Sequence, residues 1–425
     1  MANVFYGQSG GATAVINASA AGVISRARQQ KQHIGTVYAG ENGITGALSE
    51  RLYDTHHESD TAIDALRYTP GCAFGSCRFQ LADFHDDPSQ YHRLFDVFKA
   101  HNIRYFIYNG GGDSQDTTLK IAEASQQVGY DITCIGIPKT IDNDLPFTDS
   151  APGFGSVAKY IAIATQECAL DLQSMSNSFT QVFILEVMGR HAGWIAAASG
   201  IGKTNSADPP HIILFPERPF EKDTFLSQVR YSVEHYGFCV IVCSEGIVDR
   251  QRIPISHSNA ERDAFGHHKM GGVAASLAQM IQCHLNYKYH YAIADYLQRS
   301  AAHIASKTDV EQAYALGQAA IDKAIQNSPP VMLTIERLST HPYRWQIGSA
   351  PLDQVAKVER QLPQSFISAN GFEITAECRD YLTPLIEGEH YPPYENGLIA
   401  YHTLKKILTP QRLSTKHMST ESSVL

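Results

Sequence analysis

Two acidic side chains in the run Gly136-Ile-Pro-Lys-Thr-Ile-Asp-Asn-Asp144 have the types and spacing needed for proton transfer. Alternate residues of an extended segment face the same way, so Thr140, Asp142 and Asp144 are expected to share one face. One carboxylate would accept a proton from an attacking hydroxyl, and the other would help to hold Mg²⁺. An Asx-rich turn that satisfies its own backbone is the alternative, but it leaves the Pro-Lys-Thr before it unexplained.

Two glycine-rich turns precede this run and have the form of anion-binding turns. They are Gly7-Gln-Ser-Gly-Gly11 and Asn109-Gly-Gly-Gly-Asp113-Ser114, each between a short apolar run and a helical pattern. Backbone N–H groups at a helix N-terminus converge with the helix dipole on an anion, and glycine lets the backbone approach phosphate oxygens closely. Tight strand-to-helix connections have the same composition, and Asp113 or Ser114 could simply cap a helix. The candidate phosphate contacts are Gly10, Gly11, Gly112 and Ser114.

Short apolar runs position these turns. Runs rich in Val, Ile and aromatic residues are typical of buried parallel strands. They lie at residues 4–6, 105–108, 132–135, 182–187, 212–215 and 239–243. The segments between them carry helical periodicity, with Ile16, Ala20, Val23 and Ala27 on one face. The alternation predicts an α/β chain whose turns line one crevice at the carboxyl ends of the strands.

The pattern changes after residue 300. Thr308-Asp-Val-Glu311 has the form of a capping box and predicts a helix to about Gln326. Residues 329–410 are richer in Pro and Tyr and are expected to form an accessory extension rather than another wound sheet. Residues 414–425 are polar and are predicted to be disordered. Residues 265–272 are rich in Gly and His and suggest a mobile loop near the site. Adjacent histidines on a chain rarely point at one ion, so a metal site is the less favoured interpretation there.

Composition narrows the function classes. The net charge is −9 and no long Lys/Arg run is present, which argues against nucleic-acid or membrane-surface binding. No secretory signal is visible, and no apolar run approaches the roughly 20 residues that span a bilayer. The eight cysteines contain no CxxC pair, so a reduced, cytoplasmic chain is expected. Cys239 and Cys243 are expected to be buried small hydrophobes.

Together these motifs resemble the phosphofructokinase family. The resemblance rests on Pro138-Lys-Thr-Ile-Asp-Asn-Asp144 after the Gly-Gly turn, followed by Glu186-Val-Met-Gly-Arg190, Ser244-Glu-Gly246 and Asp295-Tyr-Leu-Gln-Arg-Ser300. It implies two similar Rossmann-like three-layer α/β domains with mainly parallel sheets, plus a C-terminal extension, and an active site between the domains. Residues 1–140, with parts of 250–300, would bind the phosphoryl donor. Residues 141–250, with about 300–340, would bind the sugar phosphate, and 341–425 would form the extension.

The resemblance also implies a role for individual residues. Asp142 would be the general base that deprotonates the 1-hydroxyl of fructose 6-phosphate, with Arg190 stabilising the transferring phosphoryl group. The implied sugar-phosphate contacts are Thr140, Met188, Gly189, Glu245, Tyr296 and Arg299, the last two at the 6-phosphate. Without the resemblance, Arg190 would more often be a helix cap, Glu245 a solvated loop acid and residues 295–300 the end of an amphipathic helix.

Asp113 and Lys139 indicate the phosphoryl donor. ATP-using members of the family have glycine at these two positions, whereas pyrophosphate-using members have Asp and Lys. A carboxylate repels the α-phosphate of a nucleotide and fills its space, while an ammonium grips pyrophosphate. A salt bridge across the crevice is the alternative explanation. Gly112 stands where most relatives carry an acid or amide, so Mg²⁺ would rely on Asp113, Asp144, water and pyrophosphate oxygens.

Three other functions compete with reversible transfer from pyrophosphate to fructose 6-phosphate. They are an ATP-dependent family member, a non-catalytic relative that binds sugar phosphates, and a dinucleotide-binding protein. The presence of Asp142, Arg190, Glu245 and Arg299 argues against the second, and the absence of G-x-G-x-x-G argues against the third. The family resemblance implies a homodimer.

Overall fold

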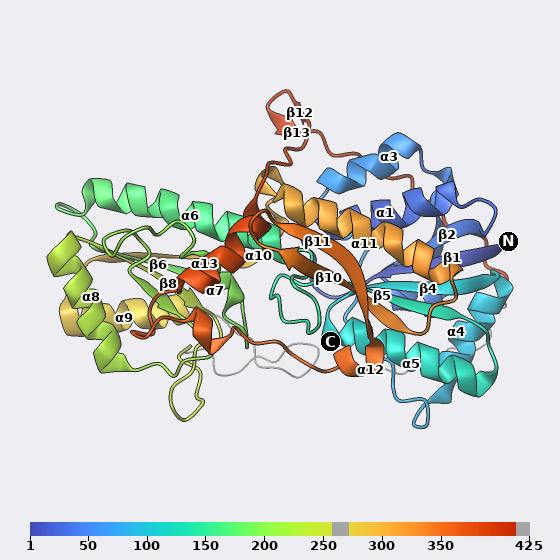
Figure 1. Ribbon diagram of the computed structural model, residues 1–425, viewed down its shortest axis with the longest axis horizontal. Helices are drawn as coiled ribbons and strands as arrows, with labels where there is room; N and C mark the ends of the chain where they lie inside the picture. The colour runs from blue at the N-terminus through green and yellow to red at the C-terminus, as the bar shows by residue number, and fades with distance from the viewer. Residues whose placement is uncertain (257–271, 414–425) are drawn as a thin grey trace.

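The computed structural model describes residues 1–256 and 272–413. Two lobes, each built on a sheet, lie side by side along the longest axis of the molecule (Figure 1). The predicted loop at 265–272, up to Gly271, and the predicted disordered tail at 414–425 lie outside the described residues. Within the described ranges, no helix has the length and apolar character required to cross a membrane.

The first sheet has seven strands in the order β11-β10-β5-β4-β1-β2-β3. Its strands are β1 (Ala2–Gln8), β2 (Ile34–Gly40), β3 (Leu52–Asp54), β4 (Ile103–Gly110), β5 (Thr133–Pro138), β10 (Val331–Ser339) and β11 (Arg344–Pro351). The five central strands run parallel, and β3 and β11 are antiparallel edges. The predicted parallel strands at 4–6, 105–108 and 132–135 are confirmed as parts of β1, β4 and β5.

Helices cover both faces of the first sheet. They are α1 (Ile16–Gln29), α2 (Ile44–Leu48), α3 (Asp60–Ala65), α4 (Pro88–Ala100), α5 (Gly112–Val128) and α11 (Lys307–Ile325). Alternate residues of β1 face opposite layers: Val4 and Tyr6 pack with α1 and α11, whereas Phe5 packs with α4 and α5. Gly22 and Gly317 allow α1 and α11 to meet, because a Cβ on either would lie about 2 Å from a carbonyl oxygen of the other helix.

The second sheet has four parallel strands in the order β7-β8-β6-β9. They are β6 (Val182–Val187), β7 (Ile212–Leu214), β8 (Cys239–Ser244) and β9 (Tyr289–Ile293). Its helices are α6 (Phe154–Met175), α7 (Trp194–Ala198), α8 (Lys222–Tyr236), α9 (Val273–Leu285) and α10 (Asp295–Ser300). Helices α6 and α7 pack on one face and α8 and α9 on the other, so the lobe has three layers. Cys239 and Cys243 are fully buried, as predicted.

Two segments distant in the sequence complete the sheets. Residues 331–351, expected to lie in the second domain or the extension, form β10 and β11 and extend the first sheet beside β5. Residues 289–293, in the range 250–300 of which only parts were expected with the first domain, form β9 beside β6 in the second sheet. Both pairings join segments distant in the sequence, so no local pattern indicates them.

The N-cap predicted at Thr308 lies two residues earlier, at Ser306, and α11 begins at Lys307. Ser306 is the N-cap of α11, and its hydroxyl accepts from the Asp309 N–H at 3.4 Å. Thr308 instead donates to the Glu387 carbonyl at 3.3 Å. The carboxylate of Asp309 accepts from the N–H groups of Gly153 (3.0 Å) and Ser156 (2.8 Å) at the start of α6. The polar residues in this stretch therefore cap two helices rather than one.

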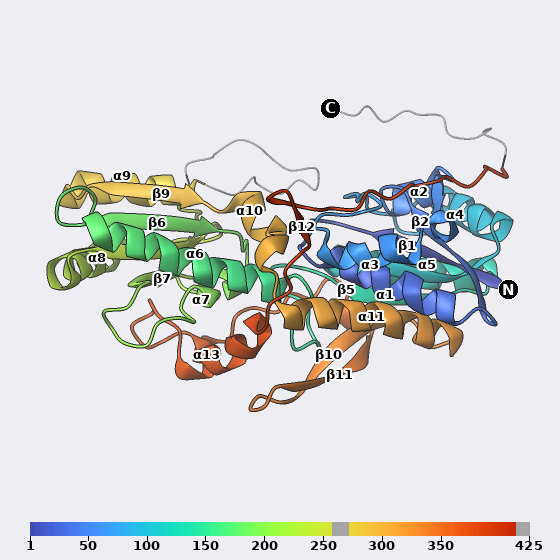
Figure 2. The same cartoon turned by 90° about the horizontal axis from the view of Figure 1, so that it is seen from above.

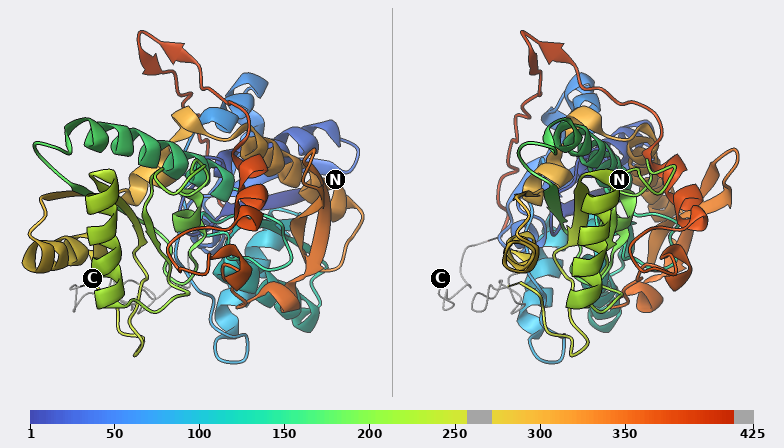
Figure 3. Two further views of the ribbon diagram at one scale, coloured as in Figure 1. Left: turned by 60° about the vertical axis from the view of Figure 1, so that its left-hand side comes forward. Right: turned by 90° about the vertical axis from the view of Figure 1, so that its left-hand side faces the viewer.

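The remainder of the chain returns to the first lobe. After α12 (Leu352–Val355) and α13 (Ala376–Leu382), the short hairpin β12 (Tyr394–Glu395) and β13 (Leu398–Ile399) stands out from the body of the molecule (Figures 1 and 3). The chain after the hairpin runs back over the first lobe (Figure 2). Residues 404–413, which we call the C-terminal strap, then lie along β3. The Asp54 N–H donates to the Ile407 carbonyl and the Thr409 N–H to the Leu52 carbonyl, both at 2.8 Å.

Candidate active site

The turn after β1 is braced by the loop at residues 71–78. The Gly10 N–H donates to the Cys77 carbonyl at 3.2 Å, and the Ser76 hydroxyl donates to the Gly10 carbonyl at 2.7 Å. Gly10 has φ +77°, a left-handed conformation that favours glycine. The backbone of the turn is therefore fixed before any ligand binds.

Two cations reach this turn from other elements. A Cβ on Gly10 would lie 3.2 Å from Nζ of Lys139, and a Cβ on Gly11 would lie 3.0 Å from Nη1 of Arg299. Lys139 follows β5 in the first lobe, whereas Arg299 lies on α10 in the second. Because neither glycine has a side chain, cations from both lobes lie close to the backbone of this turn. Backbone N–H groups beside two cations form a site suited to an anion.

The turn after β4 opens α5. A Cβ on Gly110 would overlap the Ser114 hydroxyl, whereas Gly112 has open space around its Cα. Ser114 is buried beneath the turn, and Asp113 is exposed in the first turn of α5. Gln115 ties the turn to the next strand by donating to the carbonyls of Gly110 (2.9 Å) and Ile137 (3.3 Å). Packing explains the glycine at 110 but not the one at 112.

Lys139 is a buried cation that connects two of the predicted motifs. Its side chain is nearly fully buried, and its Nζ donates to the Gly11 carbonyl at 2.7 Å. Burial lowers the pKa of Lys139 to about 8, against the opposing effects of Cys72, Asp142 and Asp144. An ammonium held this way keeps donors available for an anion at the turn.

The Asp142–Asp144 segment is a bend and not the predicted extended strand. The Asp142 N–H donates to the Thr140 hydroxyl at 3.0 Å, and Asn143 adopts a left-handed φ of 53°. Burial raises the pKa of Asp144, and a hydrogen bond from Thr140 to the Asp144 carboxyl opposes that shift. The bend therefore gathers the three predicted side chains, although strand alternation is not the reason.

The two half-buried carboxyl groups repel each other. Burial raises the pKa of Asp142, with Asp144 and Glu245 acting in the same direction and Lys139 and Arg190 opposing, to a net value of about 8. Burial also raises the pKa of Asp144. Carboxyl groups with a raised pKa beside cations are suited to accept and return a proton near neutral pH.

The second lobe contributes the residues that follow β6 and β8. Gly189 has φ +131°, and its carbonyl accepts from the buried Ser244 hydroxyl. The Glu245 N–H donates to the Val187 carbonyl at 2.9 Å, and burial raises the pKa of the Glu245 carboxyl. The charge of Arg190 lowers the pKa of both Glu245 and Asp142, so its guanidinium lies near residues of both lobes.

Helix α10 carries the last predicted residues. The Arg299 guanidinium stacks over the Tyr296 ring at 3.7 Å, and the ring itself is largely exposed. The Met188 N–H donates to Gln298 Oε1 at 3.4 Å, which joins α10 to the loop after β6. The structure thus brings Arg299 to the Gly11 turn, whereas Tyr296 faces outward.

Sequence reasoning missed three groups near these motifs. The first is the loop at 71–78, whose Cys72 thiol is close enough to Lys139 and Arg299 for their charges to lower its pKa against the effect of burial. The second is Glu186, which accepts from the N–H groups of Gly272 (3.0 Å) and Ala274 (2.8 Å) at the start of α9. The third is the segment at 359–362 of the C-terminal extension. Glycines at 71 and 75 were the only sequence signal for the first group.

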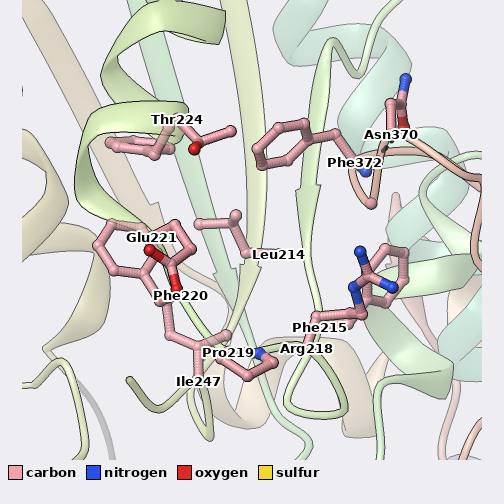
Figure 4. A pocket seen from close by; sticks show the side chains of 12 residues that line it. Leu214, Phe215, Arg218, Pro219, Phe220, Glu221, Thr224, Ile247, Asn370 and Phe372 are labelled. Atoms are coloured by element: carbon pink, nitrogen blue, oxygen red, sulfur yellow. Dashed lines mark hydrogen bonds between the residues drawn. The ribbon is translucent and has the colours of Figure 1, made fainter. Parts of the chain in front are cut away.

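A separate cavity lies in the second lobe, away from this constellation. A cavity of about 100 Å³ lies between β7, α8 and the loop at 370–372, lined mainly by Leu214, Phe220, Phe225, Ile247 and Phe372 (Figure 4). None of the predicted site residues lines it. Among residues 1–256 and 272–413, no group of three or more His, Cys, Asp or Glu side chains could hold a metal ion.

Comparison with known proteins is consistent with this site. Residues 3–324 match the family described as Phosphofructokinase. The chain is 54% identical over 412 residues to a pyrophosphate–fructose 6-phosphate 1-phosphotransferase of Methylococcus capsulatus, covering 97% of this chain and 98% of that protein. It is 51% identical over 412 residues to a protein of the same name from Xanthomonas campestris, with the same coverage. The crystal structure of a pyrophosphate-dependent phosphofructokinase from Marinobacter aquaeolei matches with a TM-score of 0.90 and 54% identity, covering 98% of this chain and all of that one.

Proposed function

The chain belongs to the phosphofructokinase family, and from that membership we propose that it transfers a phosphoryl group from pyrophosphate to the 1-hydroxyl of fructose 6-phosphate. The products are fructose 1,6-bisphosphate and phosphate. The donor assignment rests on Lys139, whose position is glycine in ATP-using members of the family. Its buried ammonium is held at the Gly10–Gly11 turn. The relatives at 51–54% identity carry the name of the same reaction.

The geometry supports a division of labour between the lobes. The turns after β1 and β4, with Lys139, hold pyrophosphate in the first lobe. Asp142 accepts the proton of the sugar 1-hydroxyl as the oxygen attacks, and Arg190 stabilises the charge on the transferring group. Thr140, Met188, Gly189 and Glu245 contact the sugar. Catalysis rests on positioning and charge stabilisation, without a covalent intermediate.

Arg299 and Tyr296 are proposed to bind the 6-phosphate of the sugar. Gly10, Gly11, Gly112 and Ser114 are proposed to approach the phosphates of the donor. Asp113 stands exposed at the start of α5, where its charge and bulk oppose the α-phosphate of a nucleotide. This arrangement disfavours ATP as the donor.

Mg²⁺ is the proposed cofactor, held by Asp113 and Asp144 together with oxygens of pyrophosphate and water. Two carboxylates suffice, because Mg²⁺ usually keeps several waters and substrate oxygens. The open space at Gly112 is compatible with that hydration, since no side chain fills it. The ion would neutralise charge on pyrophosphate and so assist its approach to the buried carboxyl groups.

The reverse reaction provides a test of the proposed chemistry. Transfer between a phosphoanhydride and a phosphate ester of this kind should be readily reversible, so the enzyme given fructose 1,6-bisphosphate and phosphate should form pyrophosphate. The formation is followed by ³¹P NMR, with Asp142→Ala as the control variant that should form none. Release of phosphate alone, without pyrophosphate, would indicate a phosphatase and contradict the proposal.

We further propose a cytoplasmic homodimer in which the first-sheet lobe is the pyrophosphate-binding domain and the second-sheet lobe is the sugar-phosphate domain. All eight cysteines are free, which suits a reducing compartment. Edge strand β9 and helix α10 expose a run of large apolar side chains, namely Tyr291, Ile293 and Leu297. Light scattering should give twice the chain mass, and Ile293→Lys should lower it. A monomer at micromolar concentration would contradict the dimer.

A further inference from the structure

The segment Glu359–Leu362 of the C-terminal extension contacts the active site, and the proposed reaction assigns no role to it. Its Arg360 lies against the bend that carries Asp142 and Asp144. The Arg360 N–H donates to the Asp144 carbonyl at 2.6 Å. Its guanidinium donates further hydrogen bonds to the same segment, so backbone and side chain act together.

Among the described residues, the hydrogen bonds from the guanidinium of Arg360 all go to main-chain carbonyl oxygens. It donates to the Asn143 carbonyl through Nε (3.2 Å) and Nη2 (3.0 Å). Its Nη1 donates to the carbonyls of Thr148 (2.6 Å) and Asp149 (3.1 Å). One planar side chain thus fixes both ends of the segment from 143 to 149, which a single-point donor such as lysine cannot do.

A second side chain of the extension fixes the same bend. The buried Asn143 donates from Nδ2 to the Tyr381 hydroxyl at 3.0 Å, and its Oδ1 accepts from the Ala151 N–H at 3.1 Å. The Tyr381 hydroxyl in turn donates to the Asp149 carbonyl. Asn143 therefore has both ends of its amide satisfied, and its left-handed backbone sets the directions in which Asp142 and Asp144 leave the bend.

The same segment also binds the loop of the second lobe that carries Arg190. The Trp194 indole N–H donates to the Arg360 carbonyl at 3.3 Å, and the ring lies 4.8 Å from the guanidinium carbon. The Leu362 N–H and the Gly193 N–H both donate to Glu217 Oε1, at 2.9 and 2.8 Å. His191, next to Arg190, pairs with Glu359 at 2.9 Å.

We propose that Arg360 is a positioning residue for phosphoryl transfer, which holds the Asp142 bend in register with the Arg190 loop across the two lobes. This inference rests on the proposed function, because it assigns a role in that reaction. Arg360 donates to the bend without contacting the carboxyl groups themselves. Loss of its contacts should therefore misplace the base relative to the sugar hydroxyl, where an error of 1 Å can cost about a hundredfold in rate.

The test compares three variants of the full-length enzyme. Arg360→Gln should lower kcat by about 10- to 100-fold while the KM values for pyrophosphate and fructose 6-phosphate change less than about threefold. Arg360→Lys should recover part of the lost kcat. It is also the variant to be measured if Arg360→Gln does not fold. Arg379→Gln is the matched control, because Arg379 also donates to a carbonyl of the second lobe, that of Ile201 at 3.3 Å, but contacts no residue of the bend.

Chemical rescue separates positioning from a general loss of stability. Millimolar guanidinium should raise kcat of Arg360→Ala several-fold and should not raise kcat of Arg379→Ala. A kcat within twofold of the parent in folded Arg360→Gln or Arg360→Lys, or an equal loss in the Arg379 control, would overturn the inference. A parent enzyme without pyrophosphate-dependent turnover would instead overturn the proposed function, so the two failures are distinguishable.

Discussion

Lys139→Met is the substitution that most directly probes how the site holds the donor. Methionine keeps the length of the side chain and fits a buried position, but it removes the ammonium that donates to the Gly11 carbonyl at 2.7 Å. The expected loss is specific to pyrophosphate. Because the lysine belongs to the first lobe, contacts with the sugar in the second lobe should be retained.

The size of the loss follows from the burial of the charge. Truncating one partner of a buried, hydrogen-bonded charge pair costs about 2–5 kcal/mol, which corresponds to about 30- to 3000-fold in kcat/KM for pyrophosphate. Burial lowers the pKa of Lys139 to about 8, so the ammonium is mostly charged at pH 7 and mostly neutral at pH 9. The advantage of the parent over the variant should therefore shrink as pH rises through 8.

Steady-state kinetics at pH 7 and pH 9 provide the assay, with fructose 6-phosphate saturating and pyrophosphate varied. Lys203→Met is the matched control, since Lys203 is also buried and donates to a carbonyl, that of Pro210 at 3.2 Å, away from the predicted site. A loss below threefold in the Lys139 variant, or an equal loss in the control, would refute the assignment. So would a loss confined to the KM for fructose 6-phosphate.

Three further results are expected. Asp142→Asn should lower kcat by about 10²- to 10⁴-fold with fructose 6-phosphate binding retained in calorimetry, and full turnover would refute the role of base. Because the pKa of Asp142 is raised to about 8, kcat/KM of the forward reaction should rise with pH toward 8 and that of the reverse reaction should fall; parallel profiles would contradict this. Glu50→Gln should lower the free energy of unfolding at pH 7 by about 1–3 kcal/mol in urea titrations. Burial opposes ionisation of Glu50, but hydrogen bonds from the Arg412 N–H and the His101 ring hold its pKa below 4.5. The stabilisation by the Glu50 carboxylate is therefore present above pH 4.5 and is lost as pH falls through the folded-state pKa. An unchanged acid limb in the Gln variant would contradict that account.

Much of the architecture could be predicted because its signals are local. The apolar runs that became β1, β4, β5, β6, β7 and β8 are short, buried and followed by turns, and each is a strand of a parallel pair. The family resemblance supplied the pairing of two three-layer units. Buried cysteines on β8 followed from the same apolar pattern.

The parts that could not be predicted depend on contacts between distant segments. Strand β10 begins beside β5, nearly two hundred residues earlier in the chain, and β11 pairs with β10. Nothing in the composition of residues 331–351 distinguishes this arrangement from an independent extension. Ser306 and Thr308 both have an acidic residue three positions later, so either could be the N-cap of α11. Ser306 is the N-cap in the structure because the Asp309 carboxylate binds the N–H groups at the start of α6. Asn143 adopts its left-handed turn because Tyr381 and Ala151 hold its amide.

Donor selectivity of the purified enzyme tests the proposed function most directly. The kcat/KM for pyrophosphate and for ATP should be measured side by side with saturating fructose 6-phosphate and Mg²⁺. The exposed carboxylate of Asp113 and the ammonium of Lys139 predict a preference for pyrophosphate of more than about a hundredfold, since like charges brought together cost several kcal/mol. Robust turnover with ATP and none with pyrophosphate would contradict the proposed donor and the roles given to both residues.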